Sequence, residues 1–285
     1  PSRIMGVINN YVLMAVPLFI FMGIMLEKSG LAESLLETMA MMFGSVRGGL
    51  AISVVIVGAL LAASTGIVGA TVVTMGLISL PTMLKRGYKT ELATGVIASS
   101  GTLGQIIPPS IVLVLLADTI NSSSRGAESV DVGALFSAAL IPGMVLVVCY
   151  ILYILIISYI RKEDAPAIPT EEIKAFRGDN FTSKIIKVLV LPILLIVLVL
   201  GSIFSGIASP TEASAIGALG ATALTVIQRK FSFNILKDVA KETMKLTTMV
   251  FFILLGATTF TLVFRSLGGD DYLQQLILES NLSPI

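Results

Sequence analysis

The sequence contains no histidine and a single cysteine, Cys149, among its 285 residues. Without histidine, neither a Ser-His-Asp hydrolase site nor a His/Cys metal cluster can be built. One cysteine cannot form a disulfide within the chain. The motif GxxxxGK followed by Ser or Thr is also absent, so this sequence holds no P-loop for ATP. These absences remove common enzyme classes, and we expect neither an enzyme nor an organic cofactor.

Charged residues are also scarce, at 13% of the chain, whereas hydrophobic residues make up 55%. Soluble domains carry about 25% charged and 45–50% apolar residues, and the mean hydropathy here is +0.95. The net charge is only +1, so no basic field attracts nucleic acid. The composition excludes a soluble enzyme, a disordered chain and a nucleic-acid-binding protein. It predicts an all-α polytopic protein embedded in the lipid bilayer.

Long charge-free runs fill most of the sequence and predict membrane helices, since a helix needs about 20 apolar residues to cross a bilayer. The runs lie at 4–26, 48–84, 95–117, 132–160, 188–211, 213–228 and 246–264. We expect a helical pair over 183–228 and interfacial amphipathic helices at 31–43 and 233–245. All of 1–285 then forms a single transmembrane domain. Because residue 1 is Pro and not Met, we expect it to be a fragment of a longer protein.

The run 48–84 is too long for one membrane crossing and short for two. Each half reaches only about 22–25 Å as a helix. Small and polar residues from Ala62 to Gly69 separate the halves. Non-helical backbone at membrane depth persists only where protein buries it or where it lines a cavity. The run therefore predicts a re-entrant hairpin, with two complete crossings as the alternative.

Lys and Arg are distributed unequally between the two faces of the membrane. If the hairpin returns to its own side, all but three of the 19 basic residues lie on one face. The exceptions are Arg3, Arg125 and Arg265. The positive-inside rule places the crowded face in the cytoplasm. Both topologies of 48–84 give the same orientation.

A second polar interruption lies within the predicted span 92–120. Pro108 and Pro109 remove two backbone donors and disfavour helix before them, while small and hydroxyl-bearing residues precede them. Those residues are Ser99, Ser100, Gly101, Thr102 and Gly104. Broken membrane helices expose carbonyls that bind Na⁺ in secondary transporters. Close packing of small residues is the alternative for either interruption alone, but two adjacent interruptions favour a binding site.

Acidic residues do not occupy the centre of any predicted span. A proton relay usually requires such a group, so hydroxyl and carbonyl ligands favour Na⁺ over protons. Glu212 lies at the start of the run 213–228. Ser209 or Thr211 is expected to cap that helix, with Glu212 in its first turn. We prefer this capping role to proton transfer.

Taken together, these segments resemble the large membrane (M-type) subunit of tripartite ATP-independent periplasmic (TRAP) transporters. The resemblance rests on the two polar interruptions, the hairpin exit and one turn, and it covers essentially the whole sequence. The matching segments are Ser64-Thr65-Gly66 with Gly69-Ala70-Thr71, Ser99-Ser100-Gly101-Thr102 with Gly104 and Ile107-Pro108-Pro109-Ser110, Leu80-Pro81, Arg86-Gly87-Tyr88 and Ser209-Pro210-Thr211-Glu212-Ala213.

The resemblance implies an elevator-type secondary transporter with inverted repeats in the bacterial inner membrane. It implies two partners, a small four-helix membrane subunit and a periplasmic substrate-binding protein, and Na⁺-driven import of small organic acids. Carried onto this sequence, it places Ser64, Gly66, Ser100, Thr102 and Gly104 near Na⁺. It places Ser64, Thr65 and Ser110 near substrate, and Pro108 and Pro109 at the helix break. The family's second hairpin and second broken helix do not occur in 1–285.

Two other interpretations remain open from the residues. A stand-alone elevator carrier, such as a dicarboxylate/sodium symporter, works without a binding protein. An intramembrane enzyme needs a catalytic dyad or acid pair within the spans, and the sequence shows none. A purely structural subunit predicts that removing the hydroxyls of the polar interruptions has no effect.

Overall fold

A computed structural model describes residues 5–6, 10–65, 68–123, 130–176, 181 and 185–279. In these ranges the regular structure is helical and no strand occurs, which confirms the all-α prediction. The chain divides into two units, Tyr11–Thr243 and a second unit made of Pro1–Asn10 with Met244–Ile285.

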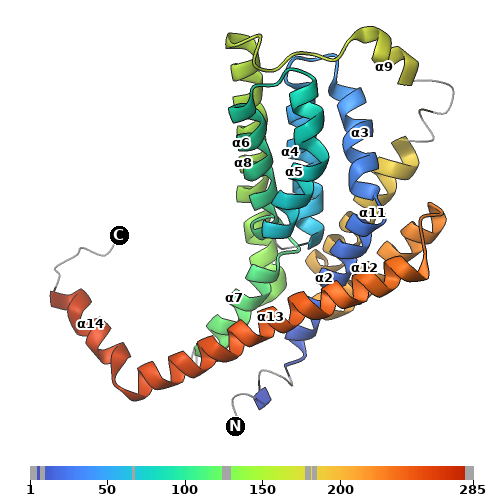
Figure 1. Ribbon diagram of the computed structural model, residues 1–285. Coiled ribbons are helices and arrows are strands. Elements are labelled where there is room, and N and C mark those ends of the chain that lie inside the picture. Colours follow the sequence, from blue (N-terminus) through green and yellow to red (C-terminus); the bar gives the residue numbers. More distant parts are fainter. Residues whose placement is uncertain are drawn as a thin grey trace. The chain divides into compact units, whose positions relative to one another are not determined.

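Figure 1 shows how the helices are arranged along the chain. In chain order they are η1 (Val12–Met14), α2 (Ala15–Lys28), α3 (Leu31–Phe43), α4 (Gly49–Thr65), α5 (Val68–Lys85), α6 (Thr90–Thr102), η2 (Leu103–Gln105), α7 (Ile111–Ser123), α8 (Val132–Ile160), α9 (Thr170–Phe176), the π-helical η3 (Ile186–Val190), α11 (Leu191–Phe204), α12 (Pro210–Ile227), α13 (Phe233–Ser266) and α14 (Gly269–Glu279).

Three of the helical segments in the described ranges are long and apolar enough to cross a membrane. They are Val132–Ile160, Ile186–Phe204 and Phe233–Ser266. A fourth crossing is formed if α2 and α3 count together, although the pair bends by 61°. The bend follows Gly30, whose φ of +68° is a left-handed conformation that glycine adopts without steric cost. The segment 233–245 is part of the continuous helix α13 and not a separate interfacial helix, since no Pro or Gly lies between Phe233 and the apolar run that begins at 246.

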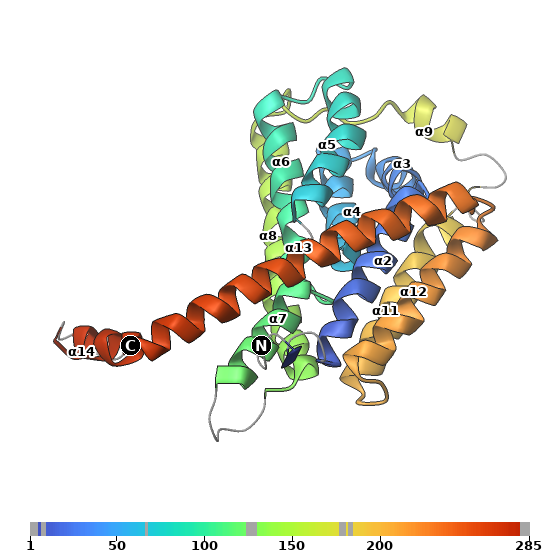
Figure 2. The same ribbon diagram turned by 60° about the horizontal axis from the view of Figure 1, so that its bottom comes forward.

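Helix α4 is the centre of the larger unit. It packs against α2, α3, α5, α6 and α8, and Figures 1 and 2 show α4, α5, α6 and α8 running side by side. Its buried residues include Leu50, Val54 and Val57. Because α4 is apolar around its whole circumference, it can be buried on several sides at once. Helices α2, α11 and α12 form the neighbouring bundle, in which α12 packs on α2 and α11.

The turn after α5 contains the motif Arg86-Gly87-Tyr88. Gly87 has a φ of +80°, and the backbone N–H of Tyr88 donates to the carbonyl of Met83 at 3.0 Å. This is the usual way in which a glycine just past the helix ends an α-helix. Tyr88 is buried beside the first turn of α4, and burial raises the pKa of its phenol to about 12.

The linker after α8 crosses the ends of three other elements on the predicted cytoplasmic side. Its carbonyls accept hydrogen bonds from the backbone N–H of Gly48 (to Ala165, 3.1 Å) and of Lys89 (to Asp164, 3.0 Å). The N–H of Ile168 in turn donates to the carbonyl of Gly44 at 2.8 Å. The linker therefore fixes the start of α4 and of α6 together.

An ion pair continues this attachment onto α9. The two terminal guanidinium nitrogens of Arg86 donate to the carboxylate of Glu172, at 2.6 and 3.2 Å. These hydrogen bonds hold the pKa of Glu172 below its ordinary value. Because the Glu172 side chain is 47% exposed and the Arg86 side chain 22%, solvent screens the pair and its contribution to stability is small.

The main described part of the second unit is the C-terminal part of α13 together with α14. Gly268, with a φ of +76°, forms the turn between these two helices. Arg265 Nε pairs with Asp270 Oδ2 at 3.1 Å across that turn. The rings of Phe260 and Phe264 stack with centroids 5.9 Å apart on α13.

Candidate functional site

A break in the backbone helix lies between α6 and α7. The α-helix ends at Thr102, the 3-10 turn η2 covers Leu103–Gln105, and α7 begins only at Ile111. Pro108 and Pro109 are buried within this break and lack the N–H groups that a continuous helix requires. The N–H groups of Ile106 and Ile107 both donate to the carbonyl of Leu103, at 3.0 and 2.8 Å.

Ser110 is the last residue of the break and directly precedes α7. Its buried hydroxyl donates to the carbonyl of Gln105 at 2.7 Å and accepts from the N–H of Leu113 at 3.4 Å. The second contact is that of an N-cap residue. The hydroxyl thus satisfies one carbonyl freed by the break, and it lies at the positively polarised end of α7.

The hydroxyls of Ser100 and Thr102 lie in different environments. Ser100 is fully buried and donates to the carbonyl of Ile97 at 3.0 Å. Thr102 is exposed and donates to the carbonyl of Ser99 at 2.8 Å. Gly104 is buried in η2. The three residues share one segment of backbone, but Ser100 lies in a helix interface and Thr102 on a surface.

Two small residues of the polar interruption pack closely against the hairpin helices. A Cβ atom added to Gly58 of α4 would lie 2.6 Å from the Cβ of Ser100. A Cβ added to Gly101 would lie 2.4 Å from a methyl carbon of Val72 in α5. Small residues let membrane helices approach closely. At these positions the packing explanation from the sequence therefore holds, whatever else the segment does.

The hairpin tip joins α4, which ends at Thr65, to α5, which begins at Val68. Ser64 and Thr65 form the last turn of α4, but their side chains lie outside what the structure describes. Gly66 lies outside the described residues altogether. Their predicted contacts with Na⁺ and substrate therefore stay predictions.

The cap of α12 is formed by Ser209 and Glu212. The Glu212 N–H donates to the Ser209 hydroxyl oxygen at 3.3 Å, and the Ser209 N–H donates to the Glu212 carboxylate at 2.8 Å. This reciprocal pair is a capping box. Thr211, the other predicted cap, does not cap the helix: its hydroxyl donates to the carbonyl of Tyr11 at 3.1 Å. Thr211 thereby joins the start of α12 to the start of η1.

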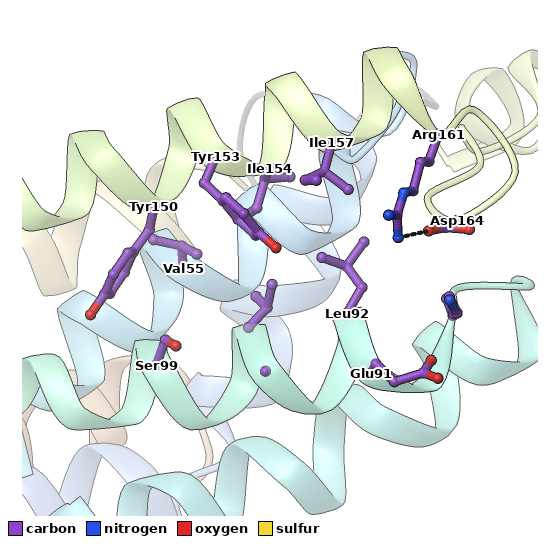
Figure 3. Close-up of a pocket in the computed structure, with 13 residues that line it drawn as sticks. Val55, Glu91, Leu92, Ser99, Tyr150, Tyr153, Ile154, Ile157, Arg161 and Asp164 are labelled. Carbon is purple, nitrogen blue, oxygen red and sulfur yellow. Dashed lines mark ion pairs between the residues drawn. The ribbon is translucent and has the colours of Figure 1, made fainter.

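A pocket of about 360 Å³ lies between α6 and α8, with Val55 of α4 at its base (Figure 3). Of the predicted polar segment, only Ser99 lines it. The sequence interpretation missed the remaining lining residues because they come from separate runs. One signal was present, however, since Gly95 interrupts a helical run, and such a glycine usually has a packing or functional reason.

Comparison with known proteins gives one family over the whole chain. The family model described as "Tripartite ATP-independent periplasmic transporter, DctM component" matches residues 1–285.

Three similar proteins are named as large permease proteins. The C4-dicarboxylate TRAP transporter large permease protein DctM of Pseudomonas aeruginosa is 32% identical over 97% of this chain and 61% of its own length. The ectoine protein TeaC of Halomonas elongata is 30% identical over 91% of this chain and 57% of its own length. The sialic acid protein SiaM of Vibrio cholerae is also 30% identical, over 91% of this chain and 57% of its own length. The chain thus spans about three fifths of these relatives.

Proposed function

Because the chain belongs to the family of DctM components of TRAP transporters, we propose that it forms part of a Na⁺-coupled importer of small organic acids. In this proposal it is the large permease subunit and works by an elevator mechanism. It assembles with a small four-helix membrane subunit and receives substrate from a periplasmic binding protein in the bacterial inner membrane. The relatives are named as permease proteins, so the chain is a transport subunit and not an enzyme.

The break between Thr102 and Ile111, next to the helix pair α4–α5, is the observation that carries the proposal. A broken helix offers two features to a charged solute. Its unwound carbonyls coordinate a cation, and the N-terminus of its second half attracts an anion. Here the second half is α7, and the buried Ser110 caps its N-terminus. A substrate carboxylate placed at this end would meet a positive dipole.

The proposed Na⁺ ligands are oxygens of Ser64, Gly66, Ser100, Thr102 and Gly104, and the proposed substrate contacts are Ser64, Thr65 and Ser110. Na⁺ is a hard cation that prefers carbonyl and hydroxyl oxygens. The hydroxyl hydrogens of Ser100 and Thr102 are directed to backbone carbonyls, which leaves oxygen lone pairs available for a cation.

The identity of the acid is a separate question, since the similar proteins are named for different solutes. Their names give C4-dicarboxylate, ectoine and sialic acid, although all three are 30–32% identical to this chain. Overall similarity therefore does not rank these solutes. We propose a small carboxylate-bearing solute, selected mainly by the binding protein. The family match favours this tripartite arrangement over a stand-alone dicarboxylate/sodium symporter.

Uptake into proteoliposomes tests the proposal, using the full-length protein with its small subunit and binding protein. We expect an inward Na⁺ gradient to stimulate uptake. The double variant Ser100→Ala with Thr102→Ala should require at least about tenfold more Na⁺, because it removes two contacts and losing even one contact to a charged group costs about 1.5 kcal/mol.

The matched control is Thr94→Ala, because Thr94 is an exposed threonine of the same helix whose hydroxyl also donates to a backbone carbonyl, that of Thr90 at 2.8 Å. This variant should keep the wild-type Na⁺ dependence. Uptake that ignores an imposed Na⁺ gradient would refute the coupling. An unchanged Na⁺ requirement in the double variant would place the ion elsewhere.

A further inference from the structure

The pocket between α6 and α8 is built from one face of each helix. Tyr150, Tyr153, Ile154 and Ile157 line it from α8, at the spacing of three and four residues that places side chains on one helix face. Arg161, directly after the end of α8, continues this wall. The opposite wall is the face of α6 that runs from Glu91 to Ser99. Figure 3 shows the two tyrosine side chains directed into the space between the helices. The pocket is therefore an elongated groove parallel to both helices.

Gly95 accounts for the width of this groove. A Cβ atom at Gly95 would meet nothing within 4 Å, whereas one at Gly58 or Gly101 would collide with a neighbouring helix. A glycine inside a helix costs about 1 kcal/mol relative to alanine. At Gly58 and Gly101 the absence of a side chain offsets this cost, because it lets neighbouring helices pack closely. At Gly95 no helix approaches, so the missing side chain leaves room for a molecule.

Charged groups of both signs lie at one end of the groove. Lys89 and Arg161 carry positive charge there, and Glu91 and Asp164 carry negative charge. Figure 3 shows Arg161, Asp164 and Glu91 at the same end. Arg161 and Asp164 are 3.8 Å apart at their closest atoms, which is too far for a strong hydrogen bond. The two positive and two negative groups balance, so this end matches a ligand that itself carries both charges.

We propose that this groove binds a phospholipid with a primary-amine headgroup, of the phosphatidylethanolamine class. Its phosphate lies by Lys89 and Arg161, and its ammonium donates to Glu91 and Asp164, since carboxylates accept the hydrogen bonds that an ammonium donates. The glycerol ester carbonyls accept from the hydroxyls of Tyr153 and Tyr150. Tyr153 is about 12 Å along α8 from Arg161, a separation suited to the ester region below a headgroup. An acyl chain follows the apolar face of α8.

The groove fits a lipid better than it fits the transported acid. Helix α8 is long and apolar enough to cross a membrane. Ile156 and Ile160 follow the groove residue Tyr153 by three and seven positions, so they lie on the strip of α8 next to the groove, and both are exposed. Tyrosines with an apolar body and a polar tip are typical of the membrane interface. A small acid requires a surplus of positive groups, whereas the charges at this end sum to zero.

Native mass spectrometry of the full-length protein, purified in mild detergent and titrated with phosphatidylethanolamine, tests the proposal. The blocking variant is Gly95→Leu, whose Cβ would meet nothing within 4 Å and whose longer side chain extends into the groove. Its matched control is Gly201→Leu, at another helical glycine where an added Cβ meets nothing within 4 Å. We expect Gly95→Leu to weaken lipid binding by about tenfold or more and the control to bind as wild type.

The headgroup assignment has its own variant and competitors. Lys89→Gln with Arg161→Gln should also weaken phosphatidylethanolamine binding, while Lys162→Gln, outside the groove, should not. Equal binding by Gly95→Leu and wild type would overturn the site. Tighter binding of phosphatidylglycerol or phosphatidylcholine would overturn the primary-amine assignment. Equal binding of soluble glycerophosphoethanolamine would show that no acyl chain is held. None of these outcomes depends on Na⁺-coupled uptake, so the lipid site and the proposed transport function can fail separately.

Discussion

The two faces of α6 use the same kinds of residue for opposite purposes. On one face Ser100 and Gly101 contact α4 and α5 so closely that a single added carbon at Gly101 would lie 2.4 Å from Val72. On the other face Gly95 and Ser99 border a groove of about 360 Å³ toward α8. Small residues therefore mark either the tightest or the emptiest side of a membrane helix. The packed neighbour, and not the residue type, decides between them.

The largest difference between the faces should come from Gly101→Ala. The new Cβ would meet the Val72 side chain at 2.4 Å and its backbone Cα and N at 3.0 and 3.1 Å. We expect the free energy of unfolding to fall by about 2–3 kcal/mol, since overpacking of a tight interface costs this much. Thermal unfolding in detergent measures it. Adding Val72→Ala should recover only part of the loss, because the backbone atoms stay in place. Wild-type stability of Gly101→Ala would mean that this face is not tight.

Gly95→Ala provides the opposite case on the same helix. The added methyl meets nothing within 4 Å, and alanine is a better helix former than glycine by about 1 kcal/mol. The same unfolding measurement should therefore show a gain in stability of up to about 1 kcal/mol. A loss similar to that of Gly101→Ala would show that α8 closes onto this face and that the groove is filled.

The smallest effect on stability is expected at the ion pair between Arg86, in the turn after α5, and Glu172 of α9. Arg86 holds the pKa of Glu172 below its ordinary value, so the folded state favours the ionised carboxylate. The contribution of the Arg86–Glu172 pair to stability is present above the unfolded-state pKa of Glu172. It is lost as the pH falls through the lower folded-state pKa. Glu172→Gln should cost less than about 1 kcal/mol at neutral pH, because the pair is exposed. The stability difference between variant and wild type should vanish in acid, and a difference that grows in acid would contradict the assignment.

Much of the architecture can be predicted from local rules. The double proline and the charge-free runs predict where α6 stops and where α8 lies, because missing donors and membrane thickness act within a single segment. The pairing of Ser209 with Glu212 follows from a three-residue spacing. Such features require no knowledge of distant neighbours.

Features that depend on neighbours could not be predicted in this way. Thr211 is a residue type that often caps helices, but its hydroxyl donates a hydrogen bond to the backbone carbonyl of Tyr11, 200 positions away. Gly95 and Gly101 are two glycines of the same helix, and the sequence does not show which of them is tightly packed. The positions of α5 and α8 decide this: Gly101 lies against α5, whereas Gly95 borders the groove toward α8. The charged residues of 233–245 predict an interfacial helix, but no helix-breaking residue separates this segment from the apolar run that follows, and α13 continues through both.

The linker that follows α8 has a consequence for how the chain is assembled. Its carbonyls at Asp164 and Ala165 accept from Lys89 and Gly48, the residues directly before α6 and α4. A ribosome releases the two helix starts long before it releases their partners. The N–H of Gly48 must therefore be satisfied by water, or by other proteins, until 117 further residues have been made (165 − 48), and the N–H of Lys89 until 75 have been made (164 − 89). The hairpin base then reaches its final hydrogen bonding only after α8 has been inserted.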